Sequence, residues 1–368
     1  MPQEQPVEHL NQRPPERPPK IAIDPQADLK TAAASAMRDG IVLVRFHQEA
    51  ALRGEVEPLH QMRVASRRLR AAVEVFASVM HGARVNVYRG DLRWLGQVAG
   101  AVRECDMTAV LIRQQAARLD AAMAAELEPV YQRLLATRET AREGLAAMTA
   151  TRRYRMLGER LMNPLIRRVV PEITVGEHAL RLIAPIAVKT RKAGKRVMAE
   201  APAEMFHTLR KRIKRLRYAF EMLSGAGGRH HRHAIERLEQ MQEILGEHHD
   251  AVALGAWLRE LAGVREALPA ATMMAAGALI QELGRHEAKL KLQSLKLWKQ
   301  FRRADVIGEA LKEIAGEAAG RRRERLKAIA EANRNGAPVN VAAQADNRGQ
   351  AEAVADKTDN PVGTENAA

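Results

Sequence analysis

Two stretches of the sequence place a histidine ahead of regularly spaced basic side chains. The first starts at His60, and the second starts 147 residues later at His207. Both fit the pattern H-x-x-R-x-x-x-[RK]-R-L-R, and each has a glutamate fourteen residues after its histidine, Glu74 or Glu221. On a helix, three cations of each stretch share one face with the histidine. We call these sets the cationic stripes: Arg63, Arg67 and Arg70 in the first stretch, and Arg210, Lys214 and Arg217 in the second.

The chemistry that such a stripe suits is the binding of an anion. Guanidinium groups bind phosphate oxygens through paired hydrogen bonds, and lysine supplies a point charge. Successive cations climb the helix by ~4.5–6 Å, which suits a linear anion with one charge per short repeat. The histidine can donate a hydrogen bond, and it gains charge as the pH falls toward about 6.5.

The competing interpretation of each stripe is a solvated helix face that is paired with neighbouring carboxylates. Like charges four residues apart repel, so the stripe costs stability unless it faces solvent, a partner or an anion. Two copies that both retain the histidine, in a chain this basic, favour anion binding.

The opposite face of each stretch is apolar at helical spacing, which predicts two helices buried on that side. Glu57-Pro58 marks a turn before the first helix, which is expected to end near Met80. The second is expected over about 203–223. The predicted core residues are Met62, Ala65, Leu69, Val73 and Phe76 in the first helix, and Leu209, Ile213, Leu216, Phe220 and Leu223 in the second.

The composition indicates an all-α protein. Helix formers outweigh β-branched residues, and aromatic residues make up only 3% of the 368 residues. The self-match indicates an internal duplication. We predict a duplicated helical bundle over 25–335, with halves of about 25–165 and 172–335. A proline-rich lead, 1–24, and a tail without apolar periodicity, 336–368, are expected to be disordered.

Apolar residues recur at helical spacing in most of the remaining sequence. Pro171 marks the junction of the halves, 225–228 and the histidines that follow it are expected in a loop, and the segment 245–250 is expected to separate two helices. The further predicted helices cover about 28–52, 86–118, 119–148, 155–170, 177–198, 233–244, 251–261, 285–303 and 305–333, and another begins after Pro269.

The charge of the chain implies an anionic partner. The formal net charge is +15 and the pI is about 10.3. The segment 337–368 carries a net charge of −3 and the first 20 residues are neutral, so the predicted fold carries about +18. The single cysteine, Cys105, excludes internal disulfides and suits a reducing cytosol. No signal segment is visible, and the longest uncharged stretch, 267–281, is too short to span a bilayer.

Five ordered elements of the sequence resemble those of the CHAD family, the conserved-histidine α-helical domain. Two are the stretches that begin at His60 and His207. The segment 100–106 resembles the family's Gly-x-x-Arg-Asp-x-Asp element, with Glu104 in place of the usual aspartate. Leu245-Gly246-x-x-x-Asp250 resembles its counterpart in the second half, and the segment 297–301, Leu-Trp-Lys-Gln-Phe, resembles the closing helix.

The resemblance covers about residues 25–305 and implies both a fold and a function. It implies two helical bundles related by pseudo-two-fold symmetry, and a basic surface that binds inorganic polyphosphate. It also implies association with polyphosphate granules in bacteria. For this chain we expect a cytoplasmic location, with polyphosphate granules as a candidate site within the cell. Many relatives carry an N-terminal triphosphate-tunnel domain. The 24 residues before the expected fold are too few for one, so the usual source of catalysis in fused members is not expected.

Two other functions fit part of the sequence. A nucleic-acid-binding protein would share the charge, but the chain shows no recognition-helix, zinc-finger or RNP pattern and has few aromatic residues for stacking. A phosphotransfer or phosphohydrolase enzyme would use His60 or His207 as nucleophile, but no activating base accompanies either. We favour polyphosphate as the partner over nucleic acid, and we expect no membrane partner.

The histidine-rich segments 230–233 and 248–250 raise the question of a metal site. Such a site needs further ligands at defined spacing, and none is apparent. We therefore predict no metal, no cofactor and no catalytic residue. Arg103, Glu104, Asp106 and Asp250 are interpreted as structural partners of the motif arginines or as helix caps. The predicted ligand-binding residues are His60, Arg63, Arg67, Arg70, His207, Arg210, Lys214 and Arg217.

Overall fold

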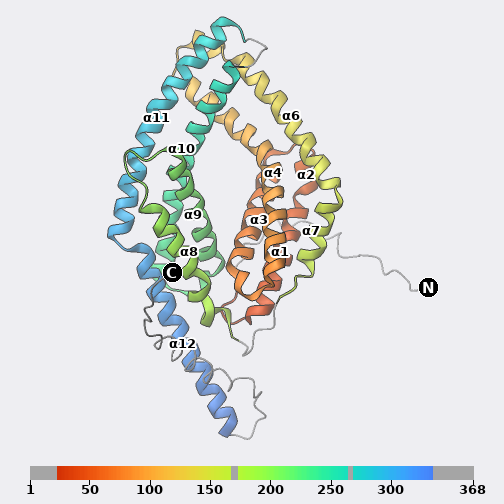
Figure 1. Ribbon diagram of the computed structural model, residues 1–368, viewed down its shortest axis with the longest axis vertical. Coiled ribbons are helices and arrows are strands. Elements are labelled where there is room, and N and C mark those ends of the chain that lie inside the picture. The colour runs from red at the N-terminus through yellow and green to blue at the C-terminus, as the bar shows by residue number, and fades with distance from the viewer. Residues whose placement is uncertain (1–22, 167–172, 264–267, 335–368) are drawn as a thin grey trace, which may run out of the picture.

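The structure is a computed structural model and describes residues 23–166, 173–263 and 268–334. All regular secondary structure in these ranges is helical, with two isolated bridges and no strand, which confirms the predicted all-α fold class. The helices form an elongated molecule (Figure 1). They are α1 (Leu29–Phe46), α2 (Gln48–Leu52), α3 (Val56–Val75), α4 (Gly82–Ala116), α5 (Ala121–Ala125), α6 (Glu128–Ala150), α7 (Arg152–Met162), α8 (Val175–Gly194), α9 (Ala203–Met222), α10 (Arg229–Ala262), α11 (Ala270–Arg303) and α12 (Val306–Arg334).

The two cationic stripes lie on α3 and α9. Each of these helices has 20 residues, and α9 begins and ends 147 residues after α3. A short 3-10 helix follows each, η2 (Phe76–Val79) and η3 (Ser224–Ala226). The predicted turn at Glu57-Pro58 is wrong, because α3 already starts at Val56. Proline is tolerated there, since the N–H groups of a first helical turn have no partner within the helix.

The apolar faces of both motif helices are buried as predicted. All ten predicted core residues are at most 5% exposed. The neighbours that cover them are α1 and α4 for α3, and α8 and α10 for α9. Burying these faces fixes the rotation of each helix about its axis, and therefore the direction in which its stripe points.

The buried apolar residues of the described ranges form two clusters. The larger surrounds α1, α3, α8 and α9. The smaller lies at one end of the molecule, where α4 and α6 meet α10 and α11 (Figure 1), and it includes Cys105. Both clusters contain residues from 25–165 and from 172–335. The boundary between the halves and their pseudo-two-fold symmetry stay predictions.

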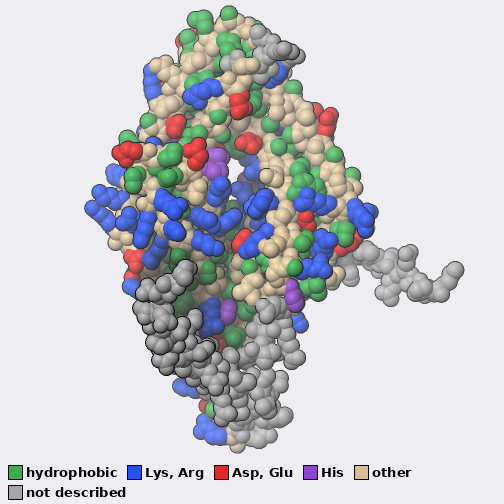
Figure 2. All heavy atoms as spheres, in the orientation of Figure 1, with side chains coloured by type: hydrophobic (Ala, Val, Ile, Leu, Met, Phe, Trp, Pro, Cys, Tyr) green, Lys and Arg blue, Asp and Glu red, His purple; other side chains and the backbone are tan. Residues whose placement is uncertain are grey.

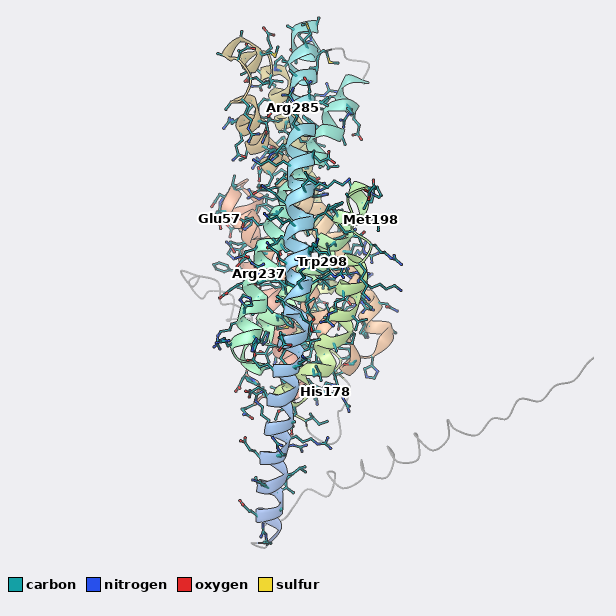
Figure 3. All side chains as sticks on the ribbon, turned by 90° about the vertical axis from the view of Figure 1, so that its left-hand side faces the viewer. Glu57, His178, Met198, Arg237, Arg285 and Trp298 are labelled. Atoms are coloured by element: carbon teal, nitrogen blue, oxygen red, sulfur yellow. The ribbon has the colours of Figure 1, made fainter. Side chains whose placement is uncertain are left out.

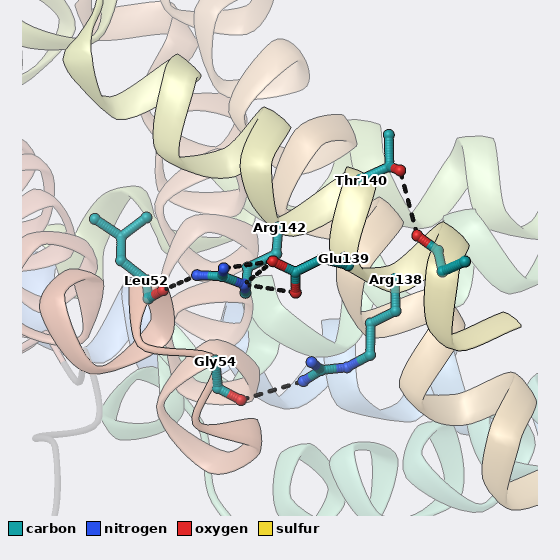
Figure 4. A network of polar contacts seen from close by, with 7 residues as sticks. Leu52, Gly54, Arg138, Glu139, Thr140 and Arg142 are labelled. Atoms are coloured by element: carbon teal, nitrogen blue, oxygen red, sulfur yellow. Dashed lines mark hydrogen bonds and ion pairs between the residues drawn. The ribbon is translucent and has the colours of Figure 1, made fainter. Parts of the chain in front are cut away.

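The loop that leads into α3 is held by α6. Gly54 has a φ of 90°, which glycine adopts without steric cost. Its carbonyl oxygen accepts a hydrogen bond from Arg138 Nη2 at 3.1 Å, and Leu52 O accepts one from Arg142 Nη1 at 2.9 Å (Figure 4). Glu139 holds Arg142 from within α6. These bonds fix the start of α3, and with it the position of the first stripe.

The helix α10 differs most from the interpretation of the sequence. It runs from Arg229 to Ala262 without interruption, so the predicted loop at 230–233 and the predicted separation at 245–250 are both wrong. His231 is buried, and its Nε2 lies 3.0 Å from Phe220 O. Only 227–228 separates η3 from α10. Burial of His231 outweighs the modest helix propensity of histidine. The predicted helix over 119–148 is likewise two helices, α5 and α6.

The predicted disordered segments fall almost wholly outside the described residues, as does Pro171. Ile23, the first described residue, donates its backbone N–H to Met222 O at 3.0 Å. The described chain therefore begins in contact with the end of α9. None of the helices in the described ranges is long and apolar enough to cross a membrane.

Candidate anion-binding groove

The two cationic stripes face each other across the contact between α3 and α9. Arg67 and Lys214, the middle cations of the two stripes, line one cavity together. All six stripe cations are partly buried, and the charge of Arg67 on α3 acts on both Arg210 and Lys214 on α9. We call the space between them the groove. Figure 2 shows a hollow on this face of the molecule with Lys and Arg side chains along part of its border.

The first cation of each stripe is held by the helix that follows. Arg63 Nη1 donates to Gly100 O of α4 at 2.6 Å, and Arg210 Nη2 lies 3.8 Å from Asp250 Oδ1 of α10. Asp250 is therefore a partner of a motif arginine, as predicted. Burial, together with the positive charge of Arg67, lowers the pKa of Arg63 to about 10. These two cations contribute charge to the groove while they also anchor the packing of the helices.

The last cation of the second stripe is balanced by carboxylates. Arg217 Nη1 lies 3.1 Å from Glu221 Oε1 and 2.7 Å from Glu239 Oε1, and its side chain is only 12% exposed. The role of Arg217 in ligand binding stays a prediction. The two neighbouring carboxylates offset its charge and would compete with a bound anion.

The other three stripe cations, Arg67, Arg70 and Lys214, have no ion pair and no hydrogen bond within the described residues. The Nε atom of Arg67 is buried without a hydrogen-bond partner. The same holds for Arg210 Nε and for His207 Nδ1. Buried polar groups are nearly always hydrogen-bonded, so three unpaired nitrogen atoms so close together are unusual in a folded protein.

The unpaired cations line a cavity of about 190 Å³, which we call the basic cavity. Seven of its twelve lining residues are Lys or Arg, and Glu74 is the one carboxylate. Glu74 accepts two hydrogen bonds from Arg89, at 3.1 and 2.9 Å, and its charge also acts on Arg70 and Arg215, so one carboxylate faces seven cations. The lining cations are Arg67, Arg70, Arg89, Arg93, Lys211, Lys214 and Arg215.

The crowding of cations changes the protonation of the groove. Burial, and then the charges of Arg210 and Arg67, lower the pKa of Lys214 to about 7. Burial and the charge of Arg215 lower the pKa of Arg70. Burial and the neighbouring positive charges both disfavour the charged forms of Lys214 and Arg70. The charge of a bound anion would act in the opposite direction and favour the charged forms.

Neither predicted histidine has a raised pKa. Burial is the largest cause that lowers the pKa of His60, followed by the charge of Arg103. Burial also lowers the pKa of His207, whose ring packs against that of His249 with 4.2 Å between centroids. Burial and the charge of Arg210 lower the pKa of His249 to about 3. The expectation that the motif histidines gain charge near pH 6.5 is therefore wrong, and near neutral pH they are neutral hydrogen-bonding groups.

A second cavity, of about 660 Å³, lies beside His60 and has a different charge. It shares Arg67 and Tyr218 with the basic cavity. Its lining contains three arginines and two glutamates, against seven cations and one glutamate in the basic cavity. The unbalanced positive charge of the groove is therefore concentrated on the side of the basic cavity.

Several residues of the groove were not predicted from the sequence. Arg89 and Arg93 come from α4, while Lys211 and Arg215 lie on α9 beside the second stripe. The basic run 210–217 was a signal for the α9 pair. The sequence does not show which neighbouring helix closes the cavity. The roles of Arg89 and Arg93 on α4, and the contact of His249 with His207, could therefore not be predicted from it.

The other polar residues singled out in the sequence lie apart from the basic cavity. Asp106 is paired with Arg138, 2.7 Å away, rather than with a motif arginine. His248 is buried against Phe206, with 5.0 Å between ring centroids. Within the described residues, no three His, Cys, Asp or Glu side chains are placed to hold a metal ion. That the chain binds no metal stays a prediction.

Comparisons with known proteins agree with this fold. The sequence model of the CHAD domain matches residues 36–259. The crystal structure of the CHAD domain from the plant Ricinus communis is similar, with 26% identity and a TM-score of 0.63, over 78% of this chain and 96% of that one. PptA from Streptomyces chartreusis is 17% identical, with a TM-score of 0.60, over 74% of this chain and 100% of that one. Among curated proteins, no sequence matches this chain.

Proposed function

The chain belongs to the CHAD family, and we propose that it binds inorganic polyphosphate in the groove between α3 and α9. The observation that carries this proposal is the basic cavity. Cations from both motif helices meet there, and Arg67, Arg70 and Lys214 form no ion pair within the described residues. An anion with closely spaced charges would supply acceptors and relieve the repulsion between the stripes.

The lining of the groove favours polyphosphate over nucleic acid. Proteins that bind single strands combine basic residues with aromatic side chains on which bases stack. Tyr218 is the one aromatic residue that lines the basic cavity or the second cavity. The groove therefore offers many phosphate contacts and little surface for bases, which suits a polymer made of phosphate alone.

Binding without chemistry is the second part of the proposal. A nucleophilic histidine needs an activating base. The partner ring of His207 is His249, which is crowded by the cations Arg210 and Lys214. The charge of Glu57 acts on His60, but within the described residues no carboxylate forms an ion pair or a hydrogen bond with that histidine. We expect no orthophosphate release and no phosphohistidine after incubation with polyphosphate. Either product would identify the chain as a phosphotransfer or phosphohydrolase enzyme instead.

Polyphosphate granules are the location that this function suggests. A cytoplasmic protein whose groove holds long-chain polyphosphate would be retained where that polymer accumulates. A fluorescent fusion should then overlap with stained granules, and loss of the basic cavity cations should disperse it.

The direct test is an equilibrium titration of the purified protein with long-chain polyphosphate over a series of salt concentrations. We expect tight binding at low salt that weakens steeply as salt rises, because binding releases counterions. For B-DNA the slope is about −0.9 per neutralised phosphate, which gives a scale for the effect. Absence of binding at low salt would contradict the proposed function.

The pKa of Lys214 predicts a specific pH dependence of binding. In the free protein this pKa is about 7, and a bound anion raises it. Below pH 7 the amine is charged in both states. Above pH 7 the free protein loses the proton first, so the affinity should fall by up to about tenfold per pH unit until the pKa of the complex is reached.

Lys214→Arg is the matched control for this effect, because arginine stays charged over the whole range. Titrations of both proteins between pH 6 and pH 9 share the same ligand, so any titration of the polyphosphate itself cancels in the comparison. The wild-type protein should lose affinity above about pH 7, and Lys214→Arg should lose much less. Identical profiles would show that Lys214 does not control the pH dependence.

A further inference from the structure

The outer face of α8 and its surroundings carry a second concentration of positive charge. Lys189, Lys192, Lys195 and Arg196 are exposed there, at the C-terminal end of α8 and just after it. None of them has an ion pair within the described residues. The groove does not include these side chains, and the packing of α8 does not require them, because its buried residues lie on the opposite face.

Two cavities lie under these cations. The first, of about 380 Å³, is lined by Lys189, Lys192, Arg196 and Arg212 together with neutral residues, and no carboxylate contributes to it. Four cations around one concave surface without a counter-charge are the electrostatic footprint of an anion site.

The second outer cavity, of about 510 Å³, lies between α8 and the end of α11. Trp298 and Phe301 are stacked with 5.3 Å between their centroids and form its apolar part. Trp298 lies on α11 (Figure 3). Trp298 occupies the space that a side chain at Gly194 would need, so α8 and α11 pack closely there. The cations that line it are Arg191, Lys192, Lys195 and Arg302. Its one carboxylate, Asp305, is paired with Arg191.

Neighbouring residues of α9 line the basic cavity and the first outer cavity. Lys211 lines the basic cavity, and Arg212, the next residue on α9, lines the first outer cavity. Lys192 then lines both outer cavities. Figure 2 shows the corresponding band of Lys and Arg side chains across the molecule, from one edge to the hollow. We call the cations Lys189, Lys192, Lys195, Arg196 and Arg212 the outer belt.

We propose that the outer belt is a second binding segment for the same anion, which holds the part of a long polyphosphate chain that extends beyond the groove. This inference rests on the proposed function, because the groove must hold the first part of the chain. The charges of the belt lie along a path rather than at one point. Lys189 and Lys192 are three residues apart on α8, and Arg212 on the neighbouring helix α9 lines the same cavity. Such a path suits a linear ligand, and each additional phosphate contact releases counterions.

The outer belt makes the affinity for polyphosphate depend on the length of the polyphosphate chain. A short ligand such as inorganic tripolyphosphate fills the basic cavity and leaves the belt empty. A long chain occupies the groove and the belt together, so its affinity exceeds that of the short ligand through contacts that only the long chain makes.

The test compares three proteins in titrations with tripolyphosphate and with long-chain polyphosphate at matched salt. The belt variant is Lys189→Ala/Lys192→Ala/Arg196→Ala. The control variant, Arg322→Ala/Arg323→Ala/Lys327→Ala, removes the same charge from exposed positions of α12 that line neither the groove nor the outer cavities. The third protein is the wild type.

We expect the belt variant to lose roughly three- to hundredfold in affinity for the long chain, with a shallower salt dependence. Its affinity for tripolyphosphate should match the wild type, and the control variant should match the wild type on both ligands. Equal losses in the belt and control variants would overturn the proposal, since only net charge would matter. So would an unchanged affinity of the belt variant for the long chain. Failure of the wild type to bind either phosphate ligand would instead refute the proposed function itself.

Discussion

Replacing Arg67, Arg70 and Lys214 together by methionine is expected to weaken the binding of long-chain polyphosphate by roughly a thousandfold or more. These cations meet in the basic cavity and have no ion pair within the described residues. Each replacement removes a charge-assisted hydrogen bond to a phosphate group, worth ~1.5–3 kcal/mol. Even the lower value, summed over three contacts, corresponds to about three powers of ten in affinity.

The same variant should stay folded. Methionine keeps the apolar part of each side chain, and the replacement removes mutual repulsion between partly buried cations. Circular dichroism and thermal unfolding should show an unchanged or slightly higher Tm without ligand. The α12 control variant, which loses three positive charges elsewhere, should bind like the wild type. A folded methionine variant with unchanged affinity would place the site outside the groove.

Leu216→Ala is expected to lower the stability of the protein and to leave its binding cations in place. The free energy of unfolding should fall by roughly 2–5 kcal/mol. Leu216 is 0% exposed on α9, on the side opposite the second stripe. Removal of its side chain leaves a cavity that the helices around α9 cannot fully close. Urea unfolding monitored by circular dichroism measures the loss directly.

Leu292→Ala is the matched control for this prediction. It makes the same chemical change on α11, where the side chain is 65% exposed, and should alter the free energy of unfolding by less than about 0.5 kcal/mol. Where the Leu216→Ala protein is still folded, at low temperature and without urea, it should bind polyphosphate through its intact cations. Equal unfolding free energies for the two alanine variants would show that the face of α9 holding Leu216 is not part of the core.

Periodicity alone predicted the parts of the fold that depend on apolar burial. Leu69 and Leu216 lie at helical spacing among other apolar residues, and each is completely buried. The offset of 147 residues between the stretches reappears in both boundaries of α3 and α9. A buried face of a helix must be apolar along its whole length, so it leaves a strong pattern in the sequence.

The alignment of Gly100 with Gly246 has a structural counterpart. A side-chain carbon placed on Gly100 would lie 3.2 Å from Arg63, and one on Gly246 would lie 3.8 Å from Arg210. In each case the first arginine of a stripe packs over a glycine of the next long helix. The sequence showed that these residues recur together, but not that they touch.

Polar contacts between helices could not be predicted in the same way. The pairing of Arg217 with Glu239, and the packing of His207 on His249, depend on how two helices are rotated and placed relative to each other. Neither pair has a fixed spacing in the sequence. Arg217 therefore looked equivalent to Arg70, although Arg217 forms two ion pairs with carboxylates and Arg70 forms none within the described residues.

The most direct test of the central claim is a competition experiment with the wild-type protein. Labelled long-chain polyphosphate is bound at fixed salt, and unlabelled polyphosphate, tRNA, duplex DNA and ATP are added at equal phosphate concentrations. We predict that unlabelled polyphosphate displaces the labelled chain at a concentration far below that of any other competitor, because the groove offers phosphate contacts with one aromatic residue for stacking. Equal displacement by tRNA or duplex DNA would contradict the account and identify the groove as a general polyanion site.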